Sequence, residues 1–343
     1  MAITNSELPF VLLRATQAWP DNMSATDFVP QFEAIKAITE TQTADIRQLG
    51  VLPDENDVKL TWLNNCDLTV DACSDSVCTF SGETASSYVQ TLSIDQCRQT
   101  EFSESLDVWR GNEFGLANAL AIDLLKTEKA HVEYISQYAV GVINANLGVN
   151  EHDNMGQWTI NGTTTEIQGS EWESTAIYGK LRRNAIKNRL DNPFLLTGEN
   201  LDQLAYMSMT SMANADGKGD AQRASQMKAY FDLFNVEAVN TTSYVTYMIN
   251  RGALAFASKG YFTRVDDPLN PRAPEVIDGN YTRFSIANRF LPQLIHDVEV
   301  VKSCASGVWK VNYRVKSRYK VFVNPTGCTA TRTGMLSFTN TGI

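Results

Sequence analysis

The longest helical pattern in this sequence runs from Leu116 to Leu147 and contains no proline. Good helix formers fill it, and Gly148 follows as a natural stop. Its large apolar side chains recur at near-helical spacing: Leu116, Leu120, Leu124, Val132, Ile135, Val142 and Leu147. At 1.5 Å per residue such a helix is about 48 Å long, whereas the mean helix has roughly 11–12 residues. The sequence therefore predicts one helix far above the usual length.

A second strong pattern lies near the C-terminus, from Trp309 to Val323, where apolar and polar residues alternate. One predicted face holds Trp309, Val311, Tyr313, Val315, Tyr319, Val321 and Val323, and the other holds Lys310, Asn312, Arg314, Lys316, Arg318 and Lys320. A period of two is typical of a strand with one buried face. An apolar side packed on a helix, with the polar side left open, fits an antiparallel α+β sheet. Met335, Ser337 and Phe338 predict one more short strand.

The N-terminal third predicts an arm followed by a long hairpin. Residues 1–50 are polar with short apolar patches, and Phe28 to Ile38 has apolar residues at helical spacing. Val58, Leu60 and Trp62 share one face of an extended segment, and Tyr88 to Ile94 predicts a return strand. A hairpin of this length is marginal alone and needs a surface to lie on.

Between these parts the sequence predicts more helices. Leu201 to Met212, Ala221 to Phe234 with Asp220 as its cap, and Val245 to Ser258 are the expected helical segments. A basic patch precedes them, formed by Lys180, Arg182, Arg183, Lys187 and Arg189. It is interpreted as the solvated face of a short helix, with phosphate binding as the alternative.

Charge is distributed unevenly along the chain. The net charge of −10 argues against an overall electrostatic grip on nucleic acid. Residues 1–105 hold 5 basic and 16 acidic residues, a net of −11, whereas residues 106–343 hold 24 basic and 23 acidic, a net of +1. This uneven distribution of charge favours head-to-side association of identical copies, because opposite charges on different parts of the chain can meet. The alternative is a set of solvated faces that happen to segregate.

The sequence contains no recognisable targeting or membrane segment. The N-terminal residues have no basic region followed by an apolar run, so no secretory signal is predicted. No stretch approaches the roughly 18 apolar residues that a membrane span requires. We expect a soluble chain made in a cytoplasm.

Six cysteines are many for a cytoplasmic protein: Cys66, Cys73, Cys78, Cys97, Cys304 and Cys328. No C-x-x-C pair is present, and residues 1–130 contain no histidine, so the support for a structural zinc site is weak. Disulfides that form once the protein has left a reducing cytosol are one interpretation. Free buried thiols are the other.

Signatures of catalysis are missing from the sequence. It has no G-x-S-x-G elbow, no G-x-x-x-x-G-K-[ST] phosphate loop and no H-E-x-x-H. Among the three histidines, His131 falls in the long helix and is expected to be packed or exposed. His152 follows that helix; a solvated loop is the favoured interpretation, and a metal contact is the alternative. We predict no catalytic, cofactor-binding or metal site, and no cofactor.

The order of these parts resembles the tailed-bacteriophage major capsid proteins of the Hong Kong type. The segments NPFLLTGENLDQL, TYMINRGALAFASKGYF and YKVFVNPTGC add to this resemblance, which covers nearly the whole chain. It implies an N-arm over residues 1–52, an E-loop over 53–108 and a P-domain over 109–197 and 301–343. The spine helix of the P-domain would span about 112–147, and an A-domain would span 198–300.

By this resemblance, the chain is expected to self-assemble into hexamers and pentamers of an icosahedral shell around double-stranded DNA. It implies a virion location, assembly in the bacterial cytoplasm, and a portal with a separate scaffold or decoration protein as partners. Contact with packaged DNA would be non-specific, and no membrane partner is implied. Another virion component such as a tail-tube subunit, a hydrolase with an unrecognised carboxylate site, and a soluble binding module are the alternatives.

The cysteines gain a specific interpretation from the resemblance. Some relatives join an E-loop lysine to an asparagine of a neighbouring subunit. Residues 60–109 contain no lysine here, so we expect no such cross-link. In place of that cross-link, we hypothesise that the cysteines form disulfides, which would stiffen the E-loop or link it to a neighbouring subunit.

Overall fold

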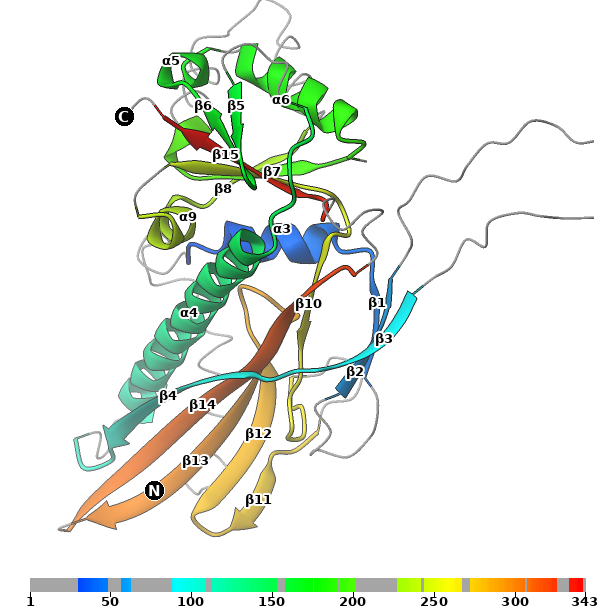
Figure 1. Ribbon diagram of the computed structural model, residues 1–343. Helices are drawn as coiled ribbons and strands as arrows, with labels where there is room; N and C mark the ends of the chain where they lie inside the picture. The colour runs from blue at the N-terminus through cyan, green and yellow to red at the C-terminus, as the bar shows by residue number, and fades with distance from the viewer. Residues whose placement is uncertain are drawn as a thin grey trace, which may run out of the picture.

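The computed structural model describes most of the chain as a mixed α+β fold (Figure 1). The described residues are 30–48, 57–62, 88–108, 113–152, 158–174, 176–190, 192–201, 227–241, 244–266, 272–305, 307–325 and 333–341. Within them, a long lower sheet carries the long helix, and an upper sheet lies near that helix's C-terminal end.

The lower sheet, called sheet B, is antiparallel and centres on the longest strand. Its order is β10 (Leu254–Ser258), β14 (Val308–Val323), β13 (Ile295–Ala305), β12 (Tyr281–Ala287) and β11 (Glu275–Asp278). The strand β4 (Gln96–Ser105) pairs with β14 on the same side as β10, further along the strand. The predicted C-terminal strand is therefore confirmed.

The long helix α4 (Glu113–Ala145) lies along one face of sheet B and confirms the main prediction from the sequence. Leu116, Leu120 and Leu124 pack there against Val311, Tyr313 and Val315 of β14, among other residues. Trp309, at the hairpin end of the strand, is 44% exposed. No helix in the described part of the chain combines the length and apolar character that a bilayer span requires.

A small sheet covers part of the opposite face of sheet B. It consists of β1 (Asp45–Gln48), β2 (Asp57–Trp62) and β3 (Tyr88–Ser93), with β2 and β3 paired antiparallel from Asp57↔Ser93 to Trp62↔Tyr88. The predicted face of Val58, Leu60 and Trp62 is buried against Ala255, Ala257 and Phe322. Sheet B is thus the surface on which the root of the predicted hairpin lies.

The upper sheet, called sheet C, joins strands from distant parts of the chain. Its order is β5 (Trp158–Asn161), β6 (Thr164–Ile167), β15 (Met335–Asn340), β9 (Val245–Ile249), β7 (Phe194–Thr197) and β8 (Ala229–Phe231). One face packs with α3 (Glu33–Thr41), α9 (Leu233–Val239) and α4, and the other packs with α5 (Gly169–Trp172) and α6 (Ala176–Lys187).

Two of the predicted helices are wrong. Residues 245–258 form β9 and β10, joined by a turn, and Val245–Ile249 is buried on both faces. Periodicity alone does not separate a fully buried strand from a buried helix. In residues 221–234, the described part contains β8, and the helix α9 begins only at Leu233, with Asp232 as its cap. The predicted helix over 201–212 lies outside the described residues beyond Leu201.

The resemblance implies that an A-domain ends at residue 300 and that the P-domain resumes at residue 301. The two sheets do not separate at this position. The strands β10, β11 and β12 and part of β13 precede this boundary, yet they belong to the same sheet B as β14. The strand β15 follows the boundary, yet it pairs with β9 and β6 in sheet C. The range 198–300 thus contributes strands to both sheets, and the division into N-arm, E-loop, P-domain and A-domain stays a prediction.

Candidate functional site

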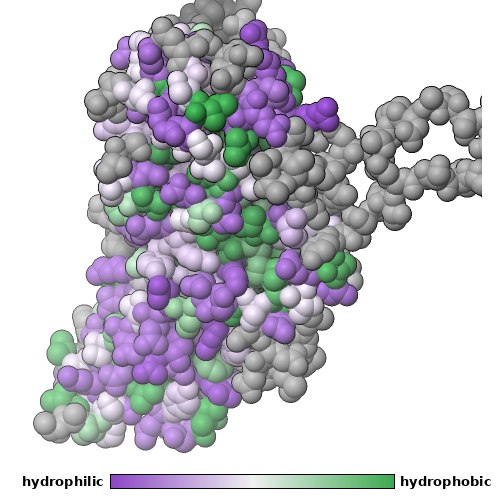
Figure 2. Space-filling view, in the orientation of Figure 1, coloured by the Kyte–Doolittle hydropathy of each residue, from purple (hydrophilic) through white to green (hydrophobic). Residues whose placement is uncertain are grey.

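The face of sheet B that points away from α4 carries a row of opposite charges across five strands. In direct cross-strand register, Arg314 of β14 lies between Glu101 of β4 and Glu299 of β13. Arg283 of β12 lies opposite Glu299, and Glu275 of β11 lies opposite Arg283. Each strand therefore contributes one charge, and the sign alternates at every step. The same face is dominated by hydrophilic residues in Figure 2.

Three of the four neighbouring pairs in this charge row are in direct contact. Arg314 Nε donates to Glu101 Oε1 over 2.6 Å, and Arg283 Nε donates to Glu275 Oε2 over 2.7 Å. Arg314 Nη1 reaches Glu299 Oε2 at 3.5 Å, and Lys316 Nζ lies 3.0 Å from the same oxygen. An exposed ion pair contributes at most about 1 kcal/mol. Like charges directly opposite one another are destabilising, so the row favours this strand register over a slipped one.

The central carboxylate of the row is held in its charged form. Burial would raise the pKa of Glu299, but the hydrogen bond from Lys316 and the positive charges around it outweigh this effect and hold the pKa below its usual value. A general acid at neutral pH needs a raised carboxyl pKa. Glu299 therefore acts as a fixed charge in the sheet.

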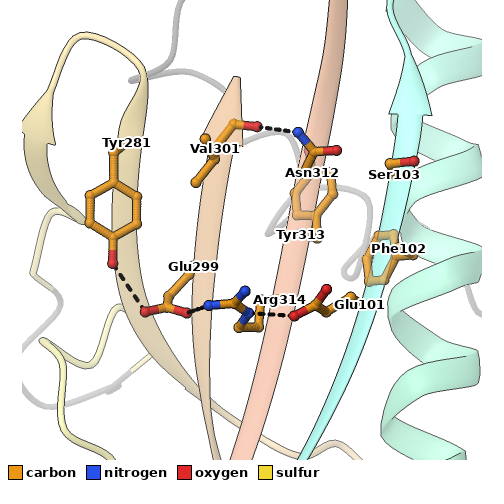
Figure 3. A pocket seen from close by; sticks show the side chains of 9 residues that line it. All are labelled: Glu101, Phe102, Ser103, Tyr281, Glu299, Val301, Asn312, Tyr313 and Arg314. Carbon is orange, nitrogen blue, oxygen red and sulfur yellow. Dashed lines mark hydrogen bonds and ion pairs between the residues drawn. The ribbon is translucent and has the colours of Figure 1, made fainter. Parts of the chain in front are cut away.

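A shallow pocket of about 420 Å³ lies over this row (Figure 3). The Tyr281 hydroxyl donates a hydrogen bond to Glu299 Oε1 over 3.1 Å, and Asn312 Nδ2 donates one to the Val301 carbonyl over 3.3 Å. Its other lining residues are Glu101, Phe102, Ser103, Tyr313 and Arg314. The charged groups at its floor are engaged with one another, and the arrangement offers a patterned polar surface for contact.

Beneath the sheet, two buried histidines link α4 to β13 and β14. His131 Nδ1 lies 2.5 Å from Ser317 Oγ, and His296 Nδ1 lies 2.7 Å from the same oxygen. The rings of the two histidines meet edge to face, with their centroids 5.4 Å apart. On the far sides, His131 Nε2 contacts Thr100 Oγ1 at 2.9 Å, and His296 Nε2 contacts Asn288 Nδ2 at 2.9 Å.

The hydrogen-bond partners determine the proton positions in this cluster. Asn288 Oδ1 accepts from the Phe290 and Leu291 amides, so Asn288 Nδ2 is a donor and His296 Nε2 must accept. His296 therefore donates from Nδ1 to Ser317 Oγ, which leaves the hydroxyl hydrogen of Ser317 available to His131 Nδ1. Both rings are satisfied as neutral imidazoles, and a proton added to His296 Nε2 would face the Asn288 amide donor.

Burial shifts three titrating groups in this region. It lowers the pKa of His131 to about 4 and holds the pKa of His296 well below its ordinary value. It raises the pKa of Glu128 to about 7, against the weaker effects of the Arg289 amide hydrogen bond and charge. The two histidines are thus uncharged at neutral pH and form a packed contact between helix and sheet.

Two of the six cysteines lie among the described residues. Cys97 of β4 and Cys304 of β13 are exposed free thiols. Cys66, Cys73, Cys78 and Cys328 lie outside the described residues, so the disulfide hypothesis stays a prediction. Over the part of the chain that the structure describes, no group of three or more His, Cys, Asp or Glu residues is arranged to hold a metal.

The other residues considered in the sequence fall in separate places. His131 is buried, and His152 is half-buried in the segment after α4, where its amide donates to Asn150 Oδ1 over 3.1 Å. In the basic patch, Arg182, Arg183 and Lys187 are exposed on α6. The carbonyl of His152 accepts from Asn184 Nδ2 of α6 over 2.7 Å, whereas His131 lies between α4 and sheet B.

Sequence reasoning missed the charge row and the joint role of the two histidines. The polar face of residues 309–323 was recognised and contains Arg314 and Lys316. The partners of these residues lie about 15 and 210 positions away, and only the strand register shows that they meet. Isolated charged residues on four other strands carry no signal of this kind in the sequence.

No protein-family model matches this sequence, and no curated protein matches it either. Solved structures that it resembles include one described as Mycobacterium phage Adephagia, with 10% identity over 96% of this chain and 98% of the other and a TM-score of 0.45. The capsid of cyanophage P-SCSP1u shows 9% identity over 95% and 94%, with a TM-score of 0.42. The mature capsid of bacteriophage PhiM1 shows 9% identity over 87% and 86%, with a TM-score of 0.39.

Proposed function

We propose that this chain is a major capsid protein of a tailed phage, a structural and non-catalytic subunit that self-assembles into an icosahedral shell around double-stranded DNA. The observation that carries the proposal is the arrangement of α4 and the root of the hairpin on opposite faces of sheet B, with sheet C at the end of α4. The order of these parts is the one that the sequence resemblance implies.

The distribution of charge supports assembly from identical copies. The first 105 residues are strongly acidic, and the last 43 contain seven basic residues and no acid. Complementary charge fixes register between subunits and suppresses wrong contacts. In this proposal the copies form hexamers and pentamers through head-to-tail contacts, which close into rings.

The proposal extends to partners and location. The shell is assembled in the bacterial cytoplasm and becomes part of the virion. A portal and a separate scaffold or decoration protein are its protein partners, and packaged DNA contacts it non-specifically.

The experiment is negative-stain electron microscopy of the purified full chain, alone and under mild assembly conditions. Rings of five or six subunits, or closed shells, are the expected result. Rigid tubes of stacked rings would instead indicate a tail component. A chain that stays monomeric at high concentration, with or without a co-expressed scaffold, would contradict the proposal.

A further inference from the structure

The helix α6 presents an exposed face that is basic with an apolar centre. Arg182, Arg183, Ile186 and Lys187 are exposed at positions that share one side of the helix, and Ile186 is 65% exposed. Residues 174–190 contain no acid. The one ion pair of α6 within the described residues joins Lys180 to Glu171 at 2.8 Å, so it does not neutralise this face.

The opposite side of α6 fixes this face in place. Ile177, Leu181 and Ala185 are buried in the core beside sheet C. Asn184 Nδ2 and Asn188 Nδ2 donate to Asn150 Oδ1 over 3.1 and 2.9 Å. The basic face is therefore presented by a rigid element.

The short helix α9 presents an exposed face of the opposite character. Leu233 and Phe234 are 36% and 61% exposed, and Ala238 lies beside them on the same side. The helix contains Glu237 and no basic residue. The exposed Glu199 lies next to it, since its amide donates to Glu237 Oε1 over 3.0 Å. This face is apolar with an acidic border.

The two faces lie on opposite sides of sheet C. Leu195 of β7 is in the core that contains α6, whereas its neighbours Phe194 and Leu196 are in the core that contains Val236 of α9. Successive side chains of a strand point to opposite faces, so the two helices cover opposite faces of the same sheet. Figure 1 shows α6 above the strands of sheet C and α9 below them.

We propose that the α6 face of one copy docks on the α9 face of the next copy. The chemistry of the two faces matches, because basic residues meet acidic ones around apolar side chains. Pairing α6 with α6 would instead bring like charges together, which disfavours a two-fold contact. Unlike faces on one unit produce a head-to-tail contact, and such a contact forms a ring when the rotation between successive copies closes. This inference rests on the proposed function, since it names the interface through which the rings form.

Charge reversal on each face tests the interface. One variant carries R183E and K187E on α6, and a second carries E199K and A238K at the α9 face. A third combines all four substitutions, and a matched control carries K126E and R251E at exposed positions elsewhere. Native mass spectrometry and electron microscopy measure assembly of the full chain at one concentration and salt, and thermal unfolding of each monomer checks the fold.

We expect each reversed variant to lose rings, with association at least about tenfold weaker than in the control. The combined variant is expected to recover them. An equal mixture of the two reversed variants can pair only in alternation, so it is expected to form six-membered but not five-membered rings. Such a parity effect does not arise from misfolding.

Two results would overturn the inference while leaving the proposed function intact. One is normal ring formation by both reversed variants. The other is ring formation that persists while R183E/K187E weakens binding to a DNA duplex, which would assign the α6 face to nucleic acid. Failure of the unmodified chain to form any ring, with or without a scaffold, would contradict the proposed function itself.

Discussion

The buried histidine cluster shows how single residues couple α4 to sheet B. His131 and His296 share one hydroxyl, and the partners on either side leave no room for an added proton at His296 without a clash of donors. An unsatisfied buried donor costs about 1–3 kcal/mol. The cluster is therefore sensitive to acid in a way that exposed histidines are not.

We predict that stability falls as the pH drops from about 6.5 towards 4. In this range the unfolded chain binds protons at both histidines, and the folded chain does not, because burial lowers the pKa of His131 to about 4 and that of His296 further. Glu128 has the opposite effect, since its pKa of about 7 lets the folded state hold a proton that the unfolded state releases above about 4.5. The net difference is one bound proton, which makes the free energy of unfolding fall by about 1.4 kcal/mol per pH unit.

Denaturant unfolding at several pH values measures this slope. The variant E128Q removes the opposing group and is expected to make the fall about twice as steep. A slope that does not change when His296 is replaced by Asn would contradict this account of the cluster.

At the scale of elements, the charge row favours the observed alignment of the strands of sheet B. Cross-strand pairs of opposite charge contribute roughly 0.2–1 kcal/mol each, and a like pair is destabilising by a similar amount. Arg314 contacts two carboxylates at once, so it is the position where reversal disturbs the row most.

We predict that R314E destabilises the protein by about 1–2 kcal/mol, because three acids then lie side by side across β4, β14 and β13. Adding E101R is expected to recover part of this loss. The unfolding free energies of the two single variants and the double variant measure the coupling. Purely additive effects of the two substitutions would show that the pair does not stabilise the register.

The whole molecule is organised so that different surfaces remain available to neighbouring copies. Sheet B is covered by α4 on one face and partly by the small sheet on the other, whereas sheet C carries unlike helices on its two faces. Because the two helix-covered faces of sheet C differ, a contact between copies joins two different surfaces. This favours a head-to-tail arrangement over two-fold pairs.

The pairing of the cysteines is expected to depend on how whole molecules assemble. Cys97 and Cys304 are exposed and unpaired within one chain. We predict that assembled particles, after exposure to an oxidising medium, contain disulfides that involve the cysteine-rich stretch 66–97 or join neighbouring copies. Non-reducing gels of particles are expected to show oligomeric bands that collapse to monomer on reduction. Monomer bands alone would exclude disulfides between subunits. A count of six free thiols per chain would exclude disulfides both within and between chains.

Sequence periodicity by itself determined the long helix, the alternating strand β14 and the paired roots of the hairpin. In each, the apolar spacing is unambiguous because one face is buried and the other is not. The same reasoning failed for β9 and β10, where both faces are buried and periodicity disappears. Only the tertiary structure shows that β15 joins sheet C and not sheet B. It also aligns five charges across distant strands and brings two histidines to Ser317. These features depend on strand register and on contacts between residues far apart in the chain, and no local pattern encodes such contacts.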